Sequence, residues 1–282
     1  MASFQAQKSL IVGVVLLAVG GIAFTEPTLR KQNAESRNQS ITPPSLIKYF
    51  TAGQNLGVSA ALWIDLVSWY GGLVVSRHTL NLRARYESDR LLEQSKLLIE
   101  LDPSFPDPYA NAAMLLAWYA GRPADSFWFL RKAMTAFPRD WTYPFYYGFF
   151  RYRFLHDRQG ASQFLAIAGK LPKCPPYIPL LATRLVHESQ GLQDAIDLLK
   201  SFLATQLPPN SRKLIENELI TLRSIQQTQL AVASYKAQFG KVPTVRDLLT
   251  AHLLSEEPHD ALGVPLKIDA EGKVTASSGG LH

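Results

Sequence analysis

The sequence has one cysteine, three methionines and few charged residues, which make up 18% of its 282 positions. A single cysteine excludes a disulfide framework and any metal site built from several thiolates. The net charge is only +6 and no long basic run occurs, so we expect no nucleic-acid partner. The hydrophobic fraction of 47%, by contrast, is enough for a sizeable core and excludes a mainly disordered chain.

Sequence motifs typical of catalytic sites are also missing. His187 and Glu188 begin like a zinc-binding helix, but no second histidine follows four residues later. There is no glycine-rich phosphate loop, and no serine lies in a nucleophile elbow. Cys174 lies in a Lys-Cys-Pro-Pro loop, and nothing in that sequence indicates the lowered pKa of a reactive thiol. We therefore expect a protein that is not an enzyme and that binds no metal or cofactor.

The N-terminal region contains an uncharged apolar stretch from Ser9 to Phe24. Its length is at the short end for a membrane-spanning helix and at the long end for the core of a signal peptide. One interpretation is a retained anchor, and the other is a signal peptide with Lys8 as its charged region and a small-residue cleavage site at Gly21-Ile-Ala23. We expect residues 1–25 to form a transmembrane anchor or signal-anchor that contacts the lipid bilayer through residues 9–24.

The charges around this stretch leave its orientation open. Lys8 lies on one side, and Arg30, Lys31 and Arg37 lie on the other. The positive-inside rule, applied literally, keeps the body of the protein in the cytoplasm. A short tail followed by an apolar core is also how exported anchors begin. We expect a single-pass protein of a bacterial cell membrane with an extracytoplasmic body.

A polar linker at residues 26–50 separates this stretch from a second apolar block, Leu56 to Val75. The block is long enough to cross a bilayer, but Asp65 in its middle would cost about 2.5 to 3.5 kcal/mol there. One interpretation is a nearly all-round buried helix that opens a helical domain. The alternative is a second span or a re-entrant segment. In the helical domain, we expect Asp65 to form a hydrogen bond or ion pair within the packing.

A period is visible in the middle of the chain. Prolines that end helical patterns recur at intervals of 34 to 36 residues, at Pro103, Pro138, Pro172 and Pro208. Glycine and alanine recur inside the units, where they allow tight turns and close helix contacts. From about Arg85 to Pro209 the chain therefore resembles the tetratricopeptide-repeat (TPR) family, whose unit is a 34-residue helix–turn–helix. The resemblance implies helix pairs stacked into a right-handed superhelix with a concave groove that binds peptides or partner helices.

Helical periodicity supports a repeat domain over residues 51–239. An apolar stripe with three- and four-residue spacing runs along Leu91, Leu92, Ser95, Leu98 and Ile99. In the unit that starts at Trp141 the small residue of the second helix is displaced, with Gly160 and Ala161 nearby. A long helix from Asn210 to Phe239 closes the domain, and its apolar side includes Leu214, Leu222, Ile225, Val232 and Tyr235.

Nine aromatic residues fall between Trp141 and Phe154, with two arginines interleaved. One helix cannot point all of them into one core face. Dense aromatic packing between repeats is one interpretation, and a partner-binding surface of tyrosine, tryptophan and arginine is the other. The candidate partner-binding residues are Trp141, Tyr143, Tyr147, Arg151 and Arg153.

The C-terminal residues, 240–282, differ in pattern from the repeats. Gly240 and Pro243 end the long helix, a short helix follows, and two brief strands at 265–268 and 273–275 flank a turn. We expect a small module with a β-hairpin and a flexible tail. The aromatic–Gly–Pro and Asp–Gly–Val spacing of this run is similar to the end of type II secretion pseudopilins, although the pseudopilin N-terminal methylation signal is not evident.

The fold class that follows is mainly α: a TPR-like solenoid of helical hairpins with an N-terminal transmembrane helix and a small C-terminal β-hairpin. The function that this organisation favours is a membrane-anchored scaffold or adaptor that binds another protein in a bacterial envelope assembly. The alternative is a structural accessory subunit of a larger membrane complex, with the Leu56–Val75 block packed on lipid or on a neighbouring subunit.

Overall fold

The computed structural model describes residues 55–77 and 79–276. The expected anchor at 1–25, the linker at 26–50 and the end of the tail lie outside the described residues. The described chain is mainly helical and ends in a two-stranded antiparallel sheet. Its helices are α3 (Asn55–Arg77), α4 (Arg85–Leu101), α5 (Asp107–Trp118), α6 (Pro123–Ala136), α7 (Thr142–Leu155), α8 (Arg158–Gly169), α9 (Tyr177–Gln190), α10 (Leu192–Leu203), α11 (Pro209–Phe239) and α12 (Val245–Thr250).

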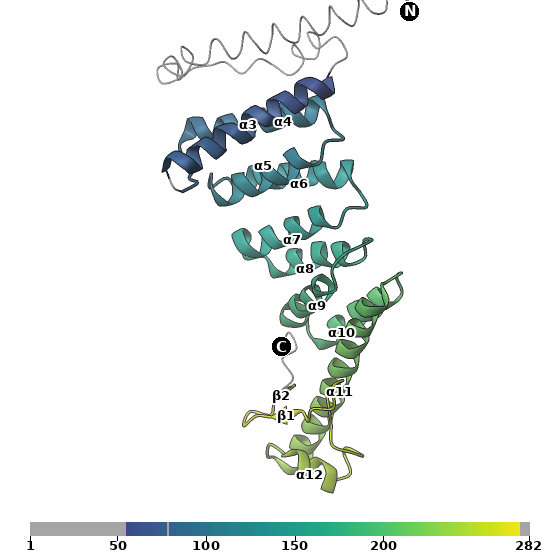
Figure 1. The fold of residues 1–282 in the computed structure, drawn as a ribbon. Helices are drawn as coiled ribbons and strands as arrows, with labels where there is room; N and C mark the ends of the chain where they lie inside the picture. The colour runs from purple at the N-terminus through teal and green to yellow at the C-terminus, as the bar shows by residue number, and fades with distance from the viewer. Residues whose placement is uncertain (1–54, 78, 277–282) are drawn as a thin grey trace, which may run out of the picture. The chain divides into compact units, whose positions relative to one another are not determined.

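The helices from α3 to α10 form successive pairs, α3 with α4, α5 with α6, α7 with α8 and α9 with α10 (Figure 1). The second helix of each pair also packs on the next pair, since α4 contacts α5, α6 contacts α7 and α8 contacts α9. The first helices of three pairs begin at equal intervals, at Asp107, Thr142 and Tyr177. The predicted mainly α, TPR-like stack of helical hairpins with a small C-terminal hairpin is therefore confirmed.

Local sequence sets where the pairs turn. Gly121 lies between α5 and α6 with φ +68°, and Gly191 lies between α9 and α10 with φ +108°, which are conformations that a side chain disfavours. Asp157 begins α8, because its carboxylate accepts a 2.7 Å hydrogen bond from the backbone N–H of Gly160. Pro123 and Pro209 stand in the first turns of α6 and α11, where a proline removes no helical hydrogen bond.

The close approach of α7 and α8 depends on small residues from both helices. A Cβ on Gly148 would lie 2.8 Å from the backbone oxygen of Ala161 and 3.1 Å from Leu165 Cγ. Ala161 is fully buried at this contact. The small residues of this unit are therefore the Gly148–Ala161 pair, which lets α7 and α8 approach closely.

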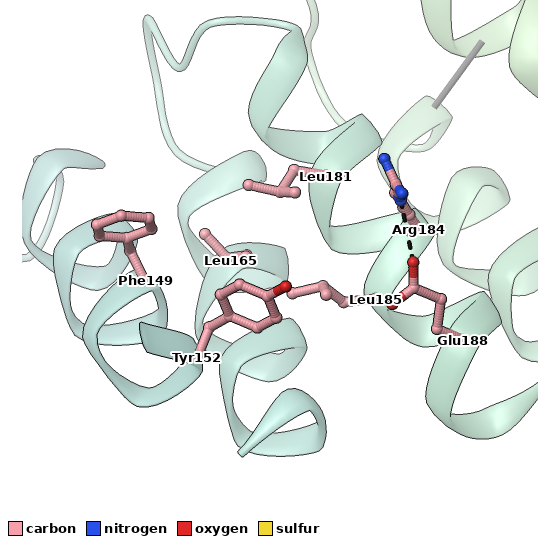
Figure 2. A pocket seen from close by; sticks show the side chains of 7 residues that line it. All are labelled: Phe149, Tyr152, Leu165, Leu181, Arg184, Leu185 and Glu188. Carbon is pink, nitrogen blue, oxygen red and sulfur yellow. Dashed lines mark hydrogen bonds and ion pairs between the residues drawn. The ribbon is translucent and has the colours of Figure 1, made fainter. Parts of the chain in front are cut away.

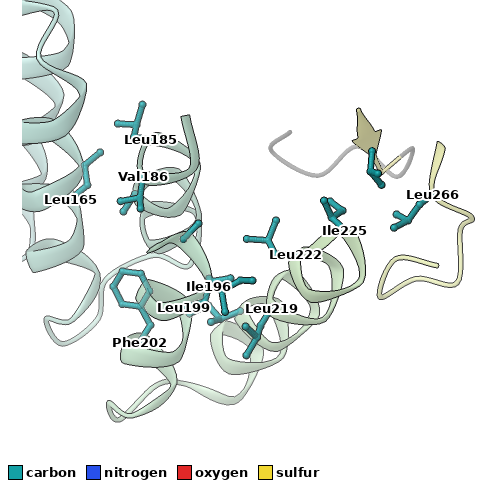
Figure 3. Packing of buried hydrophobic residues seen from close by; sticks show 14 of the residues in the cluster. Leu165, Leu185, Val186, Ile196, Leu199, Phe202, Leu219, Leu222, Ile225 and Leu266 are labelled. Atoms are coloured by element: carbon teal, nitrogen blue, oxygen red, sulfur yellow. The ribbon is translucent and has the colours of Figure 1, made fainter. Parts of the chain in front are cut away.

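Two hydrophobic clusters make up the core of the described residues. One extends from α3 to α7 and includes the fully buried Leu91, Leu98, Phe129 and Phe150, with the rest of the predicted α4 stripe. The other extends from α8 to the C-terminal strands, and Phe202, Leu199, Ile196 and Leu222 lie at its centre (Figure 3).

Helix α3 is where the structure departs from the expected all-round burial. Leu66 and Ser59 are buried, but Leu56, Ile64 and Val75 are 66%, 65% and 76% exposed. The expectation of all-round burial was wrong for α3. This helix is the first of the first pair, and its contacts with α4, α5 and the loop between them all lie on one side, so the other side stays exposed. Asp65 forms the expected ion pair, with Arg90 at 3.1 Å, but the pair lies at the surface rather than within the packing, since the Asp65 side chain is 58% exposed.

Helix α11 carries the C-terminal module on its buried side. Strands β1 (Lys267–Ile268) and β2 (Val274–Thr275) pair with Ile268 opposite Val274. Leu266 and Val274 are buried in the same cluster as Ile225 of α11. The prediction that Leu214 belongs to the apolar side of α11 was wrong: Leu214 is exposed and Ile215 is buried. Steps of four residues drift away from a 3.6-residue period, so two such steps back from Leu222 leave the stripe.

Candidate protein-binding surface

The structure places the five candidate residues in different environments. Tyr143 and Tyr147 are 2% and 7% exposed and belong to the core. Trp141 and Arg151 are half-buried, and Arg153 is exposed. The side chains therefore do not form one continuous surface, and Arg153 is the most accessible of the five.

The buried tyrosines pack between helix pairs. The ring of Tyr143 stacks on Phe137 at 5.6 Å between centroids, and the ring of Tyr147 lies 5.0 Å from that of Phe127 on α6. Burial, together with the nearby carboxylates of Asp140 and Asp107, raises the pKa of the Tyr143 phenol. These contacts are those of dense aromatic packing between repeats.

Arg151 is held at the turn between α7 and α8. Its Nε donates a 2.9 Å hydrogen bond to Asp157 Oδ2, and its Nη2 also bonds that oxygen. The N–H of Gly160 and the guanidinium of Arg151 lower the pKa of Asp157. A Cβ on Gly160 would meet both Arg151 and Asp157, so glycine at this position leaves room for the pair. Arg151 thus stabilises the turn.

Arg153 is exposed, and the partners of its guanidinium are aromatic rings rather than carboxylates. Its guanidinium lies 5.6 Å from the ring centroid of Trp118 and 5.8 Å from that of Phe154. Such cation–π contacts orient an arginine without neutralising its charge. The positive charge is therefore available at the surface.

An apolar pocket of about 220 Å³ lies between α7 and α9, above α8. Its lining residues are Phe149, Tyr152, Leu165, Leu181, Arg184, Leu185 and Glu188. Figure 2 shows Tyr152 with its hydroxyl toward Leu185, and Arg184 and Glu188 side by side at one edge. Leu165 and Leu185 are buried, whereas Tyr152 is 41% exposed. The pocket thus has an apolar floor and a rim that bears an aromatic ring and the 3.0 Å ion pair Arg184–Glu188.

A second pocket, of about 230 Å³, adjoins the first through Tyr152 and is lined also by Arg153, His156 and Arg158. Arg158 forms a long ion pair with Glu188, at 3.7 Å, and its side chain is 58% exposed. We call the two pockets together the α7–α9 groove. It combines an apolar trough with a basic end, which is the arrangement that accepts an apolar side chain beside an acidic group.

Of the residues that line the groove, the sequence predicted Arg153 as a binding residue but did not predict most of the remaining ones. Leu181 and Leu185 have the spacing of core residues, and only the packing shows that they lie under an opening. Glu188, which the sequence places in an incomplete zinc motif, lies at the rim. Among residues 55–77 and 79–276, no group of three or more His, Cys, Asp or Glu could hold a metal ion.

Cys174 lies in the loop before α9 and is half-buried. Burial raises the pKa of its thiol to about 12. The thiolate is therefore scarce at neutral pH, and the environment is opposite to that of a nucleophilic cysteine.

No family model matches the chain, and no curated protein matches it. Among solved structures, the chain is similar to pilF of Pseudomonas aeruginosa over 69% of this chain and 86% of that one, with 15% sequence identity and a TM-score of 0.36. A similarity of this degree carries no functional argument. The resemblance of the C-terminal residues to pseudopilin ends gains no support from these comparisons. The stack of helix pairs remains what is established for this chain.

Proposed function

We propose that the protein is a membrane-anchored scaffold whose α7–α9 groove binds a segment of another protein of a bacterial envelope assembly. The observation that carries the proposal is the groove itself, an apolar trough that ends at Arg153 and Arg158. Helix pairs position such a surface rigidly, so little conformational entropy is lost on binding.

The chemistry of the groove defines the segment that it accepts. Leu165, Leu181 and Leu185 favour an apolar or aromatic side chain in the trough. Arg153 and Arg158 favour a carboxylate one or two residues away along the ligand. Tyr152 lies between the two sites and belongs to a residue type that often dominates binding energy at interfaces.

The sequence supports the membrane part of the proposal. The apolar stretch Ser9–Phe24 would tether the chain to a bacterial cell membrane as a single-pass anchor, with the repeats on the extracytoplasmic side. The tether would concentrate the groove near membrane-bound partners and thereby raise its effective affinity.

Site-specific photo-crosslinking tests the groove in cells. A photoreactive amino acid replaces Tyr152 in the full chain, and the matched control carries it in place of Leu230, an exposed residue of α11. We expect a discrete crosslinked protein from position 152 and not from position 230. Adding Arg153→Glu should reduce the crosslink at least several-fold, because it places a like charge opposite the acidic group of the ligand.

Two outcomes would contradict the proposal. One is that positions 152 and 230 yield the same crosslinked proteins. The other is that Arg153→Glu leaves the crosslink unchanged, since the basic end would then have no role in binding.

A further inference from the structure

A separate surface, on α3, is apolar and exposed. The side of α3 that packs inward contacts Phe105 through Trp63, at 5.7 Å between ring centroids, and Asn111 through the Tyr70 hydroxyl at 3.3 Å. The opposite side, which we call the outer face of α3, consists of exposed residues without a charged side chain, and the exposed Asp65, which pairs with Arg90, lies at its edge. Its members are Leu56, Gly57, Ala60, Ala61, Ile64, Ser68, Gly72, Val74 and Val75.

The composition of α3 is unusually apolar for a helix that is mostly exposed. The 23-residue helix contains an 18-residue window with a mean hydropathy of 1.5, and only 11% of that window is buried. By length and composition alone, α3 could therefore cross a membrane. Its inner side, however, packs on a helix that carries charged groups, including Arg90, which contacts Asp65 and lies 4.7 Å from the Trp69 ring centroid. Contact with lipid along one face fits this arrangement better than a span surrounded by lipid.

The charged residues at the α3–α4 turn indicate which kind of lipid would contact the outer face of α3. Arg77, Arg83 and Arg85 lie around the turn that joins α3 to α4, next to Val75. The Arg85 side chain is 96% exposed, and its nearest acid, Asp89, is 3.7 Å away. Glu87 at this end is buried and paired with Arg77 at 2.7 Å. An exposed apolar face beside Arg83 and the weakly paired Arg85 is complementary to hydrocarbon under anionic headgroups.

The size of the face argues against a second copy of the chain. A helix of this length is roughly 34 Å long, and a stripe about 10 Å wide along it offers on the order of 300 Å². Stable protein interfaces in water use roughly 800 Å² on each partner. We propose that the outer face of α3 lies against a bilayer that contains anionic phospholipid, with Val75 and Ile64 in the acyl region and Arg83 and Arg85 at the phosphates.

Spin-label accessibility tests this contact at α3 itself and does not depend on how residues 9–24 behave. The full chain, in a Cys174→Ser background, carries one nitroxide at Ile64→Cys or Val75→Cys, and the matched control carries it at Leu230→Cys, an exposed leucine of α11. Each protein is reconstituted into vesicles of equal parts phosphatidylcholine and phosphatidylglycerol. We expect labels at 64 and 75 to collide more with oxygen, which partitions into lipid, than with a water-soluble nickel chelate, and the label at 230 to show the reverse.

The outcomes separate the possible occupants of the face. Labels at 64 and 75 that behave like the label at 230 would place the face in water and overturn the proposal. Labels shielded from both reagents would place it under another protein helix, which also overturns it. Lipid exposure at Val75 should fall several-fold when phosphatidylglycerol is omitted or when Arg83 and Arg85 are changed to Gln, and no change in either case would refute the role of the arginines. Loss of the groove crosslink would leave these results unaffected, so the two proposals fail independently.

Discussion

At the scale of single residues, helical glycines in this chain serve opposite purposes. A Cβ on Gly148 would collide with the backbone of α8, whereas a Cβ on Gly72 would meet nothing within 4 Å. The same substitution therefore has different consequences in α7 and α3.

We predict that Gly148→Ala lowers the free energy of unfolding by about 1 to 3 kcal/mol, because α7 and α8 must move apart to admit the methyl group. Gly72→Ala is the matched control, and it should stabilise the chain by about 0.5 to 1 kcal/mol because alanine favours the helix more than glycine does. Urea unfolding of the full chain in detergent, followed by far-ultraviolet circular dichroism, measures both. Equal effects of the two substitutions would contradict the close α7–α8 contact.

Asp157 links stability to pH. The Gly160 N–H and Arg151 lower the pKa of Asp157 below that of the unfolded chain. A lowered pKa stabilises the fold above the unfolded pKa of about 3.9, and the stabilisation disappears as the pH falls through the lower folded value.

We therefore predict that Asp157→Asn costs up to about 1 kcal/mol at pH 7 and that the difference from the wild type shrinks as the pH falls below about 4. Asparagine caps a helix about as well as aspartate does, so the difference reports the charge. Unfolding curves across this pH range check the prediction. Asp197→Asn on α10 is the control; that pair with Lys200 is solvent-exposed, and its pH dependence should be weaker. A difference that grows toward acid would contradict the assignment.

At the scale of elements, the period of the prolines and the apolar stripes were sufficient to predict the helix pairs, because both follow from local backbone and burial rules. Leu91 and Leu98, predicted on one face, are fully buried. The exposure of the outer face of α3 was not predictable from the sequence, since the burial of an apolar helix depends on how many other helices surround it. Tyr143 and Tyr147 could not be separated from Tyr152 by sequence either, because aromatic residues crowd every side of α7.

The C-terminal hairpin is an element whose packing can be tested directly. Leu266 is 3% exposed in the cluster with α11, and Leu262, four residues earlier, is 72% exposed. The N–H of Ala261 also donates to Thr221 of α11 at 3.1 Å, and Lys236 donates to the Glu271 carbonyl at 2.6 Å. These contacts pack the hairpin region against α11.

We predict that Leu266→Ala lowers the free energy of unfolding by about 2 to 4 kcal/mol, because it removes buried methyl groups and leaves a cavity. Leu262→Ala should change it by less than about 0.5 kcal/mol. Urea unfolding of the two full-length variants gives the comparison. Similar values for both would mean that the hairpin does not pack on α11.

At the scale of the whole described chain, the two hydrophobic clusters make stability a local property along the stack. Neighbouring helix pairs support one another, while pairs far apart in sequence share no core. Phe129 lies in the cluster of α3 to α7 and Phe202 in the cluster of α8 to α11, and both are fully buried.

We predict that Phe202→Ala accelerates amide hydrogen exchange mainly in α9 to α11 and that Phe129→Ala does so mainly in α4 to α6. Each substitution should cost about 3 to 5 kcal/mol within its own cluster. Exchange measured by mass spectrometry on the full chain distinguishes the two patterns. Uniform acceleration over all helices for both variants would contradict a stack of locally stabilised pairs.

Protein binding at the α7–α9 groove can be measured by hydrogen exchange on the full chain, free and in the complex captured through position 152. We predict that bound chains gain protection in the segments that contain position 152, Leu165 and Leu181, with α11 unchanged. Gained protection in α11, with the groove segments exchanging as they do in the free chain, would contradict the assignment of this surface.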